Sequence, residues 1–460
     1  MGKYLFKVNI SKKNPYGGDL LDRANSGNIL LQLIKSFPGG FVLAINGKWG
    51  SGKTTFVEMW QQQMITEGYQ ALYYNAWEMD HIADPLIGIV GEFKKMTKDV
   101  GMNQVEKFTN VFRKISFSMI PSLLAFAAKT YTGLDLKDVI KDGSKKAIDL
   151  LNECVDDYIK DQESIKAFRD EFAESVREIS SDKPIIFIID ELDRCKPDFA
   201  VKTIERIKHL FSDANVVFVL AIDRVQLGNS IKGYYGSDLI DADDYLRRFI
   251  DVQYDLPNGT VRTVENLLEV IFKQFGFDKI MIFDKKLVDS DSYGDLKSFV
   301  KSLYIEQDMS FRQLERWMLH TKLVLDYAIN SGISLQTLSY LVYLQDFDVD
   351  FYKLLMNSNI SDQDIFDHLI DFFTYSAKKG VSREKDSFLV IGELFRLKYY
   401  NDDVLYQQRI IDKNGHFKLN VNKNITIALL RKVLMDTSKK RYKSLSTIAK
   451  YLSELTPIVN

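Results

Sequence analysis

The sequence predicts an α/β fold, in which a parallel β-sheet carries helices on both faces and an α-helical region follows it. Three observations support this prediction. The apolar segment Phe41–Ile45 runs into a glycine-rich turn and then a helical pattern. The apolar run Pro184–Glu191 is rich in β-branched residues and ends in two carboxylates, which is typical of a strand buried on both faces of a parallel sheet. From about Arg262 onward the pattern is helical, with no strong strand signal.

Size and composition describe an ordinary globular protein. The chain has 460 residues, enough for two or three domains, with 46% hydrophobic and 27% charged residues. Its net charge of −2 implies no general attraction to nucleic acid or to an acidic membrane. Two cysteines, Cys154 and Cys195, form no metal-ligand or disulfide pattern, and the first residues lack the apolar core of a signal peptide. We therefore expect a reducing, cytoplasmic location.

The chain enters the predicted sheet through a helix expected near Leu20–Ser36. The cluster Phe37–Gly40 ends this helix and leads into the strand Phe41–Ile45.

The glycine-rich segment Gly47–Thr54 predicts a phosphate-binding loop. A loop with few side chains can surround a polyphosphate with backbone N–H groups, and the helix expected at about Thr54–Glu67 directs its positive end at the same anion. In this arrangement Lys53 reaches the β- and γ-phosphates and the Thr54 hydroxyl binds Mg²⁺. The alternative is a glycine turn beside a surface lysine. The predicted nucleotide contacts are Gly47, Trp49, Gly50, Ser51, Gly52, Lys53, Thr54 and Thr55.

A short aromatic strand, Gln70–Asn75, is expected after the loop and its helix. Trp77 follows it, and we predict a buried packing side chain rather than a contact with nucleotide or partner. Residues 85–180 are mostly helical by pattern. Their most apolar stretch, Ile115–Ala128, is shorter than the roughly 20 residues that a spanning helix needs. It favours a core or partner-facing helix over shallow membrane contact.

Two carboxylates end the second apolar strand, where an open parallel sheet places its ligands. Asp190 is predicted to hold Mg²⁺ through water and Thr54. Glu191 is predicted to orient and deprotonate the attacking water. The alternative is a strand that ends in an acidic turn without a catalytic role.

A helix over Pro197–Phe211 and a third strong strand over Val216–Ile222 come next. The strand ends at Asp223, which we expect beside the γ-phosphate. A final strand is expected over Phe249–Leu256.

Two arginines, Arg247 and Arg248, lie directly before that strand. They are placed to reach a phosphate in their own site or in a neighbour's, where an arginine stabilises the charge of the transition state. The equally weighted alternative is ion pairing with the aspartates of the same segment, Asp241, Asp243 and Asp244.

The C-terminal part contributes one further site candidate and one basic region. Arg312, in the first turn of a well-patterned helix, is predicted to fold back onto the nucleotide, whereas Arg316 is expected on the solvated face. Residues 421–460 carry eight Lys/Arg against two Asp/Glu, a balance of +6. The cluster Lys439–Lys443 is usually a solvated helix face, with nucleic acid or an acidic partner surface as the alternative.

Taken together, these motifs resemble the KAP family of P-loop NTPases. The resemblance rests on GKWGSGKTT, YNAWE, IIDELDRCKP, VFVLAIDR and YLRRF, in this order over roughly residues 15–325. It implies a sheet order of 5-1-4-3-2, with a strand added between the loop strand and the acidic strand. The chain departs from the family in two respects. It has Asp190-Glu191 where members commonly have Asp-Asp, and its insert is mostly polar where many members carry transmembrane helices. We therefore expect no integral membrane segment.

The resemblance implies an ATP-driven switch or scaffold, in bacteria often linked to antiphage defence. We predict an ATPase that uses ATP and Mg²⁺, forms a homo-oligomer, and binds a protein partner through its C-terminal helical region. The rivals are a non-hydrolysing, nucleotide-gated scaffold and a DNA-acting ATPase using the basic tail. No guanine-recognition motif stands out, and the base preference stays open. The expected domains are residues 1–260 as the NTPase core with its insert at about 85–180, 261–335 as a helical lid, and 336–460 as a helical domain.

Overall fold

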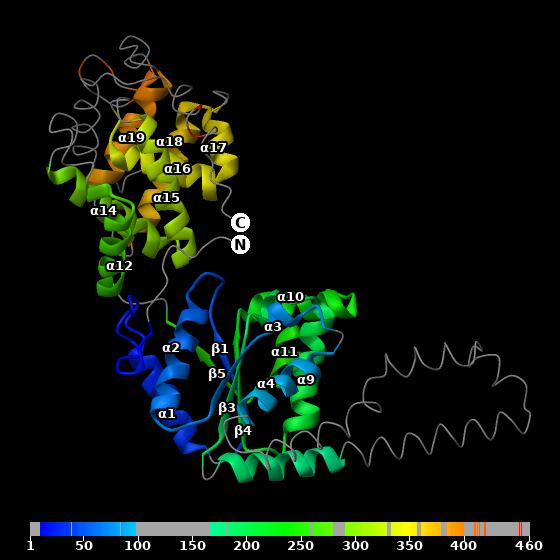
Figure 1. The fold of residues 1–460 in the computed structure, drawn as a ribbon. Helices are drawn as coiled ribbons and strands as arrows, with labels where there is room; N and C mark the ends of the chain where they lie inside the picture. Colours follow the sequence, from blue (N-terminus) through cyan, green and yellow to red (C-terminus); the bar gives the residue numbers. More distant parts are fainter. Residues whose placement is uncertain are drawn as a thin grey trace, which may run out of the picture. The chain divides into compact units, whose positions relative to one another are not determined.

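The computed structural model describes residues 10–97 except 38 and 83, 166–257 except 181–182, and most of the helices between 261 and 399. The gaps in that last part are 279–289, 329–332, 357–359 and 379–383, and only scattered residues between 409 and 452 follow it. The chain divides into two compact units, Val8–Pro257 and Asn258–Asn460, and each is described by itself (Figure 1). The predicted further division at residues 335 and 336 stays a prediction.

The first unit is built on a five-stranded sheet in the order β2-β3-β4-β1-β5, in which every pair of neighbours is parallel. β4 lies between β1 and β3, and β2 occupies the edge beyond β3. This confirms the predicted order 5-1-4-3-2, read from the other edge. The strands are β1 Phe41–Asn46, β2 Ala71–Asn75, β3 Ile185–Asp190, β4 Val216–Ile222 and β5 Val252–Asp255.

Helices cover both faces of this sheet (Figure 1). One face packs on α1 Ala24–Ser36 and α2 Lys53–Thr66. The other packs on α4 Pro85–Thr97, the helix of residues 166–180, α9 Pro197–Phe211 and α10 Arg224–Tyr235. Three short elements, α3 Ala76–Met79, η1 Leu192–Arg194 and α11 Ala242–Arg247, complete this unit.

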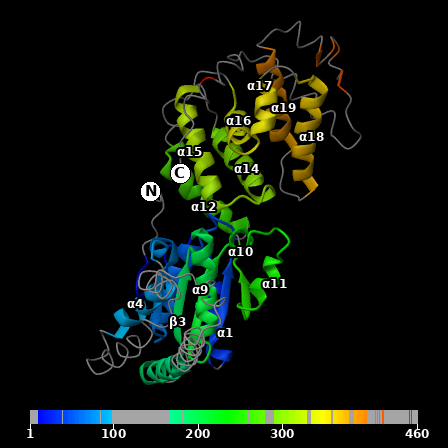
Figure 2. The same ribbon diagram turned by 90° about the vertical axis from the view of Figure 1, so that its right-hand side faces the viewer.

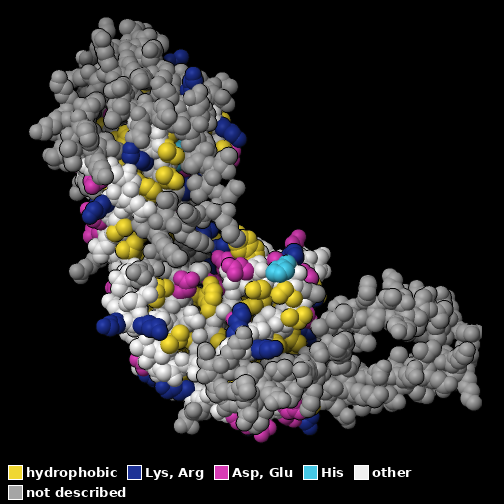
Figure 3. Space-filling model, viewed as in Figure 1, with side chains coloured by type: hydrophobic (Ala, Val, Ile, Leu, Met, Phe, Trp, Pro, Cys, Tyr) yellow, Lys and Arg dark blue, Asp and Glu magenta, His cyan; other side chains and the backbone are white. Residues whose placement is uncertain are grey.

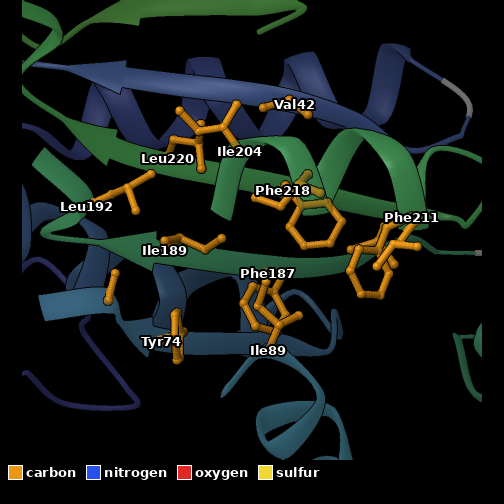
Figure 4. Packing of buried hydrophobic residues seen from close by; sticks show 14 of the residues in the cluster. Val42, Tyr74, Ile89, Phe187, Ile189, Leu192, Ile204, Phe211, Phe218 and Leu220 are labelled. Atoms are coloured by element: carbon orange, nitrogen blue, oxygen red, sulfur yellow. The ribbon is translucent and has the colours of Figure 1, made fainter. Parts of the chain in front are cut away.

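The core forms because alternate residues of each central strand point to opposite faces of the sheet. Phe187 and Ile189 of β3 pack with Phe218 of β4 against α4 and α9 (Figure 4). Ile186 and Ile188 of β3 pack on the opposite face, against α1 and α2. Every residue of β3 and β4 is buried, which matches their continuous apolar sequences. Full burial of each large aliphatic or aromatic side chain stabilises the fold by about 1.5–3 kcal/mol.

Two predicted boundaries differ from the structure by more than one residue. Helix α1 begins at Ala24, not near Leu20, because Asp22 has a positive φ of 52° and Arg23 donates its N–H to the Asp19 carboxylate. Strand β5 begins at Val252, not at Phe249, because the N–H of Phe249 still bonds to the carbonyl of Leu246 in a turn that ends α11.

The second unit is helical, as predicted (Figure 2). At the start of α15 (Phe311–Ala328), Ser310 and Gln313 cap the helix by exchanging side-chain to backbone hydrogen bonds. Arg316, expected on the solvated face, lies 3.8 Å from the buried Asp346 carboxylate and is partly buried. Helix α16 is buried all round from residue 336 to 344, as a central helix should be. The described helices of the second unit are α12 Val261–Gln274, α14 Ser290–Glu306, α15 Phe311–Ala328, α16 Leu335–Phe347, α17 Val349–Met356, α18 Asp362–Lys378 and α19 Glu384–Lys398.

Among the residues that the structure describes, none of the helices combines the length and apolar character needed to cross a bilayer. The apolar run Ile115–Ala128 and the basic cluster Lys439–Lys443 lie outside the described residues. On the face of the first unit seen in Figure 3, basic and acidic side chains are interspersed, in keeping with the near-neutral charge of the whole chain.

Candidate functional site

The glycine-rich loop between β1 and α2 has the backbone of an anion-binding turn. Gly50 and Gly52 have φ values of +78° and +83°, which favour glycine over other residues. Gly47 is restricted by contact, since an added Cβ would lie 2.8 Å from the Ser51 hydroxyl oxygen. Helix α2 begins directly after the loop at Lys53, so its positive end faces the loop. This arrangement fits a phosphate group held by backbone N–H donors.

Lys53 is held within this loop. Its ammonium donates to the carbonyls of Gly47, at 2.6 Å, and Lys48, at 3.3 Å, and lies 4.0 Å from the Asp193 carboxylate. The side chain is buried, and burial lowers the pKa of Lys53 although the nearby carboxylates oppose that shift. A desolvated cation beside loop carbonyls gains strongly from an anion, which is the role predicted for Lys53.

Asp190, the last residue of β3, has a donor set suited to Mg²⁺. Its carboxylate accepts hydrogen bonds from the hydroxyls of Tyr73, at 2.9 Å, and Thr54, and from the N–H of Glu191, at 2.8 Å. Burial raises the pKa of Asp190, and these donors counteract that shift. Mg²⁺ is commonly held by one or two oxygen ligands of the protein together with substrate phosphates. The residues therefore fit the predicted metal site, with Asp190 and Thr54 as its protein ligands.

The contact of the Tyr73 hydroxyl with Asp190 was not predicted from the sequence. Tyr73→Phe removes a donor to a buried carboxylate, and we expect the free energy of unfolding to fall by about 1.5–3 kcal/mol. Tyr254→Phe is the matched control, because the Tyr254 hydroxyl donates to the neutral Ser26 hydroxyl at 2.9 Å. That change should cost about 0.5–1.5 kcal/mol. Urea unfolding of both variants measures the difference, and equal losses would contradict this account of Asp190.

Glu191 follows β3 in a left-handed conformation, with φ 59° and ψ 24°. Its carboxylate is buried and forms an ion pair with Arg194, at 2.9 Å. The Arg194 guanidinium also lies 5.9 Å from the ring centre of Trp77. The prediction that Trp77 is buried is wrong, since the residue is 41% exposed. Trp77 lies in short helix α3 just beyond the end of β2, where the sheet no longer covers it.

Asp193 links the phosphate loop to the ends of two strands. Its carboxylate accepts from the indole N–H of Trp49 and from the backbone N–H of Asp223, both at 2.7 Å. Burial raises the pKa of Asp193, and the positive charge of Lys53 counteracts that shift. Trp49, predicted as a nucleotide contact, is thus tied through its side chain to η1, although 44% of the residue stays exposed.

Asp223 also binds the loop directly. One of its carboxylate oxygens accepts from the backbone N–H of Trp49, at 3.0 Å, and the other caps helix α10 at Val225 and Gln226. The end of β4, where a γ-phosphate contact was predicted, is therefore coupled to the middle of the loop.

Among the described residues of the first unit, Arg247 and Arg248 make no contact with these groups. Arg247 and Arg248 lie at the end of α11 and are exposed. Arg248 forms an exposed ion pair with Asp244, at 3.4 Å, which is the pairing given above as the alternative. Arg312 lies in the helical unit, in the first turn of α15, and its approach to the nucleotide stays a prediction.

Sequence reasoning missed Tyr73, Asp193, Arg194 and Arg23. Asp193 and Arg194 stand inside the quoted motif IIDELDRCKP, and the turn η1 brings them back to the site. Their charge at three to four residues after Asp190 was the available signal. For Tyr73 and Arg23 the sequence offers no such signal, because their hydrogen-bond partners are distant in the chain. The partner of Tyr73 is 117 positions away, and the partners of Arg23 are 28 to 234 positions away.

The sequence can be compared with known protein families to identify the family of the chain. The sequence profile of the KAP family P-loop domain matches residues 23–324, roughly two thirds of the chain. The chain belongs to the KAP family of P-loop NTPases. A search of the curated proteins finds no match. The KAP match spans β1 to β5 and therefore includes the loop at Lys53, the carboxylates of β3 and the end of β4. Membership supports nucleotide binding at this loop.

Proposed function

We propose that this KAP protein binds and hydrolyses ATP with Mg²⁺ and uses the reaction to switch conformation or assembly. The observation that carries the proposal is the pair Asp190-Glu191 at the end of a buried strand, on the same sheet as the loop of Lys53. Lys53 would bind the β- and γ-phosphates, and Asp190 with Thr54 would hold Mg²⁺. Bound there, Mg²⁺ neutralises charge that develops on the phosphates.

The protein's own groups account for the remaining requirements of hydrolysis. The N–H groups of the loop and the start of α2 orient the phosphates. Glu191 orients a water molecule and takes its proton as that water attacks the γ-phosphorus, and the bond to the bridging oxygen of ADP breaks. Asp193 and Asp223 fix the loop at Trp49, so a change at the phosphates reaches the ends of β3 and β4.

A second candidate is a nucleotide-gated scaffold that does not hydrolyse ATP. The ion pair between Glu191 and Arg194 favours it, because the carboxylate is held by the guanidinium, at 2.9 Å, and has to leave that partner before it can bind an attacking water. Both candidates need nucleotide binding, and they differ in the rate of hydrolysis. A DNA-acting role depends on the basic tail, whose cluster Lys439–Lys443 lies outside the described residues. The role in antiphage defence rests on the family resemblance, and the protein partner of the C-terminal region on the sequence pattern.

The assembly part of the proposal rests on Arg247 and Arg248. Both are exposed, and the ion pair of Arg248 with Asp244 has side chains 73% and 57% exposed. Exposed pairs of this kind contribute about 0 to 1 kcal/mol, so the side chain can leave its partner at little cost. An arginine that completes the site of a second copy would couple turnover to oligomer formation.

We expect the ATPase activity per subunit to rise with protein concentration. Arg247→Ala or Arg248→Ala should lower that activity while ATP affinity changes little. Mixing Arg248→Ala with Lys53→Ala protein should partly restore turnover, because each subunit type supplies the part that the other lacks. The measurement is a concentration series of ATPase rates beside light scattering with and without ATP.

Asp244→Ala is the matched control, because it removes the partner of Arg248 and keeps the guanidinium. It should leave turnover near the parent value. Activity per subunit that is independent of concentration, with no recovery on mixing, would show that these arginines serve only their local ion pairs.

A further inference from the structure

Arg23 lies at the start of α1 and is bound to the outer side of the phosphate loop. Its guanidinium donates to the carbonyl of Ser51, at 2.7 Å, and to that of Gly52, at 3.2 Å. The residue is 2% exposed. Its backbone is fixed as well, since its N–H donates to the Asp19 carboxylate. Burial of a guanidinium costs free energy, because the charge loses its hydration. Here that charge is bound to two consecutive carbonyls of a glycine-rich loop.

The effect on the loop follows from peptide geometry. In a trans peptide the C=O and the N–H point in opposite directions. When Arg23 holds the carbonyls of Ser51 and Gly52, the N–H groups of Gly52 and Lys53 are turned away from it, toward the side on which the loop receives an anion. The charge of Arg23 also polarises both peptides, which strengthens these donors.

Gly52 is matched to this contact. It has a φ of +83°, and an added Cβ would lie 3.2 Å from the Nη1 atom of Arg23. A side chain at this position would strain the backbone and also push on the guanidinium.

The same guanidinium reaches a third carbonyl, that of Pro257, at 3.2 Å. Pro257 is the last residue of the first unit, and the chain continues from it into the helical unit. One side chain therefore joins the phosphate loop to the point where the chain leaves the sheet.

We propose that Arg23 is a positioning residue of the nucleotide site, which aims the N–H groups of Gly52 and Lys53 at the phosphates and links the loop to Pro257. The inference rests on the proposed ATP binding. Removal of Arg23 leaves both loop carbonyls without their charged donor. The Ser51–Gly52 peptide becomes free to rotate, whereas the Gly52 carbonyl keeps its hydrogen bond from the N–H of Phe56, at 3.0 Å. The affinity for ATP falls as a result, and the signal from the loop to Pro257 is lost.

The test is ATP binding with Mg²⁺ by titration calorimetry, well below the melting temperature of each variant. Arg23→Ala should weaken binding by about 10- to 100-fold, equivalent to about 1.4–2.7 kcal/mol. Arg23→Lys keeps the charge but lacks the planar guanidinium group. Its affinity for ATP should lie between that of the parent and that of Arg23→Ala. Millimolar methylguanidinium should restore part of the affinity of Arg23→Ala and none of that of Lys53→Ala.

Arg206→Ala is the matched control for a merely structural role. Arg206 forms a partly buried ion pair with Asp84, at 2.8 Å, on the opposite face of the sheet. Its removal should lower the melting temperature and leave ATP affinity within about threefold, roughly 0.7 kcal/mol. Hydrogen exchange gives a second readout: ATP should slow exchange of the backbone amides of residues 252–256 in the parent and in Arg206→Ala, but much less in Arg23→Lys.

The outcomes separate this inference from the proposed function. A parent protein that binds no ATP overturns both. If the parent binds ATP and Arg23→Ala binds it with equal affinity, only the role of Arg23 is overturned. If Arg23→Ala does not fold, Arg23→Lys decides: parent-like affinity together with a parent-like exchange response at residues 252–256 overturns the inference.

Discussion

Glu191→Gln should bind ATP as the parent does and hydrolyse it about 10²- to 10⁴-fold more slowly. Glutamine keeps the shape of the side chain and can still accept a hydrogen bond from Arg194, so the turn after β3 should be retained. Glutamine cannot take a proton from water, because a neutral amide is not a base near neutral pH. Equilibrium binding and single-turnover hydrolysis of the same preparations measure the two effects separately.

Glu67→Gln is the matched control. Glu67 lies just after α2 and forms an exposed ion pair with Lys35, at 3.4 Å, so the substitution also removes one paired charge. Its hydrolysis rate should equal that of the parent. Parent-rate hydrolysis by Glu191→Gln would remove Glu191 from the mechanism. A parent protein that binds ATP without measurable turnover would favour the scaffold that does not hydrolyse ATP.

Lys53→Ala should lose most of its affinity for ATP and all measurable turnover. A charge-assisted hydrogen bond contributes about 1.5–3 kcal/mol, or roughly 10- to 100-fold in affinity, and the unscreened attraction of a buried cation adds to this. Lys53 is the lysine whose ammonium lies inside the loop, on the carbonyls of Gly47 and Lys48. Titration calorimetry with ATP and Mg²⁺ measures the loss.

The neighbouring lysine provides the control within the same loop. Lys48 is exposed, and Lys48→Ala should change ATP affinity by less than about threefold, roughly 0.7 kcal/mol. Thermal unfolding of both variants checks that the fold is kept. Equal losses in the two variants would mean that general positive charge, and not the position of Lys53, attracts the nucleotide.

The sheet could be predicted from the sequence because its signals are local. The continuous apolar runs of β3 and β4 report burial on both faces, and the glycines at positions 50 and 52 report backbone that other residues adopt with strain. The order of strands came from the family resemblance, because apolar runs alone do not say which strands are neighbours.

The network around the site could not be predicted in the same way. Tyr73 binds Asp190 only because β2 pairs with β3, and Arg23 reaches the loop only because α1 packs beside α2. Contacts of this kind depend on tertiary packing. The exposure of Trp77 was missed for a related reason, since apolar character alone does not tell whether a residue stands beyond the end of a sheet.

Because the backbone of Glu191 is left-handed, the residue that would make the fold most stable at this position differs from the residue that the proposed activity needs. A residue other than glycine in this region costs about 1–3 kcal/mol, and a glutamate lacks the short polar side chain that lets aspartate and asparagine tolerate it. Glycine at position 191 would relieve that strain and would also remove the carboxylate that we propose as the base. Selection for a more stable protein and selection for a faster one would therefore choose different residues here. A glutamate in this strained conformation is therefore what a functional requirement at position 191 would produce.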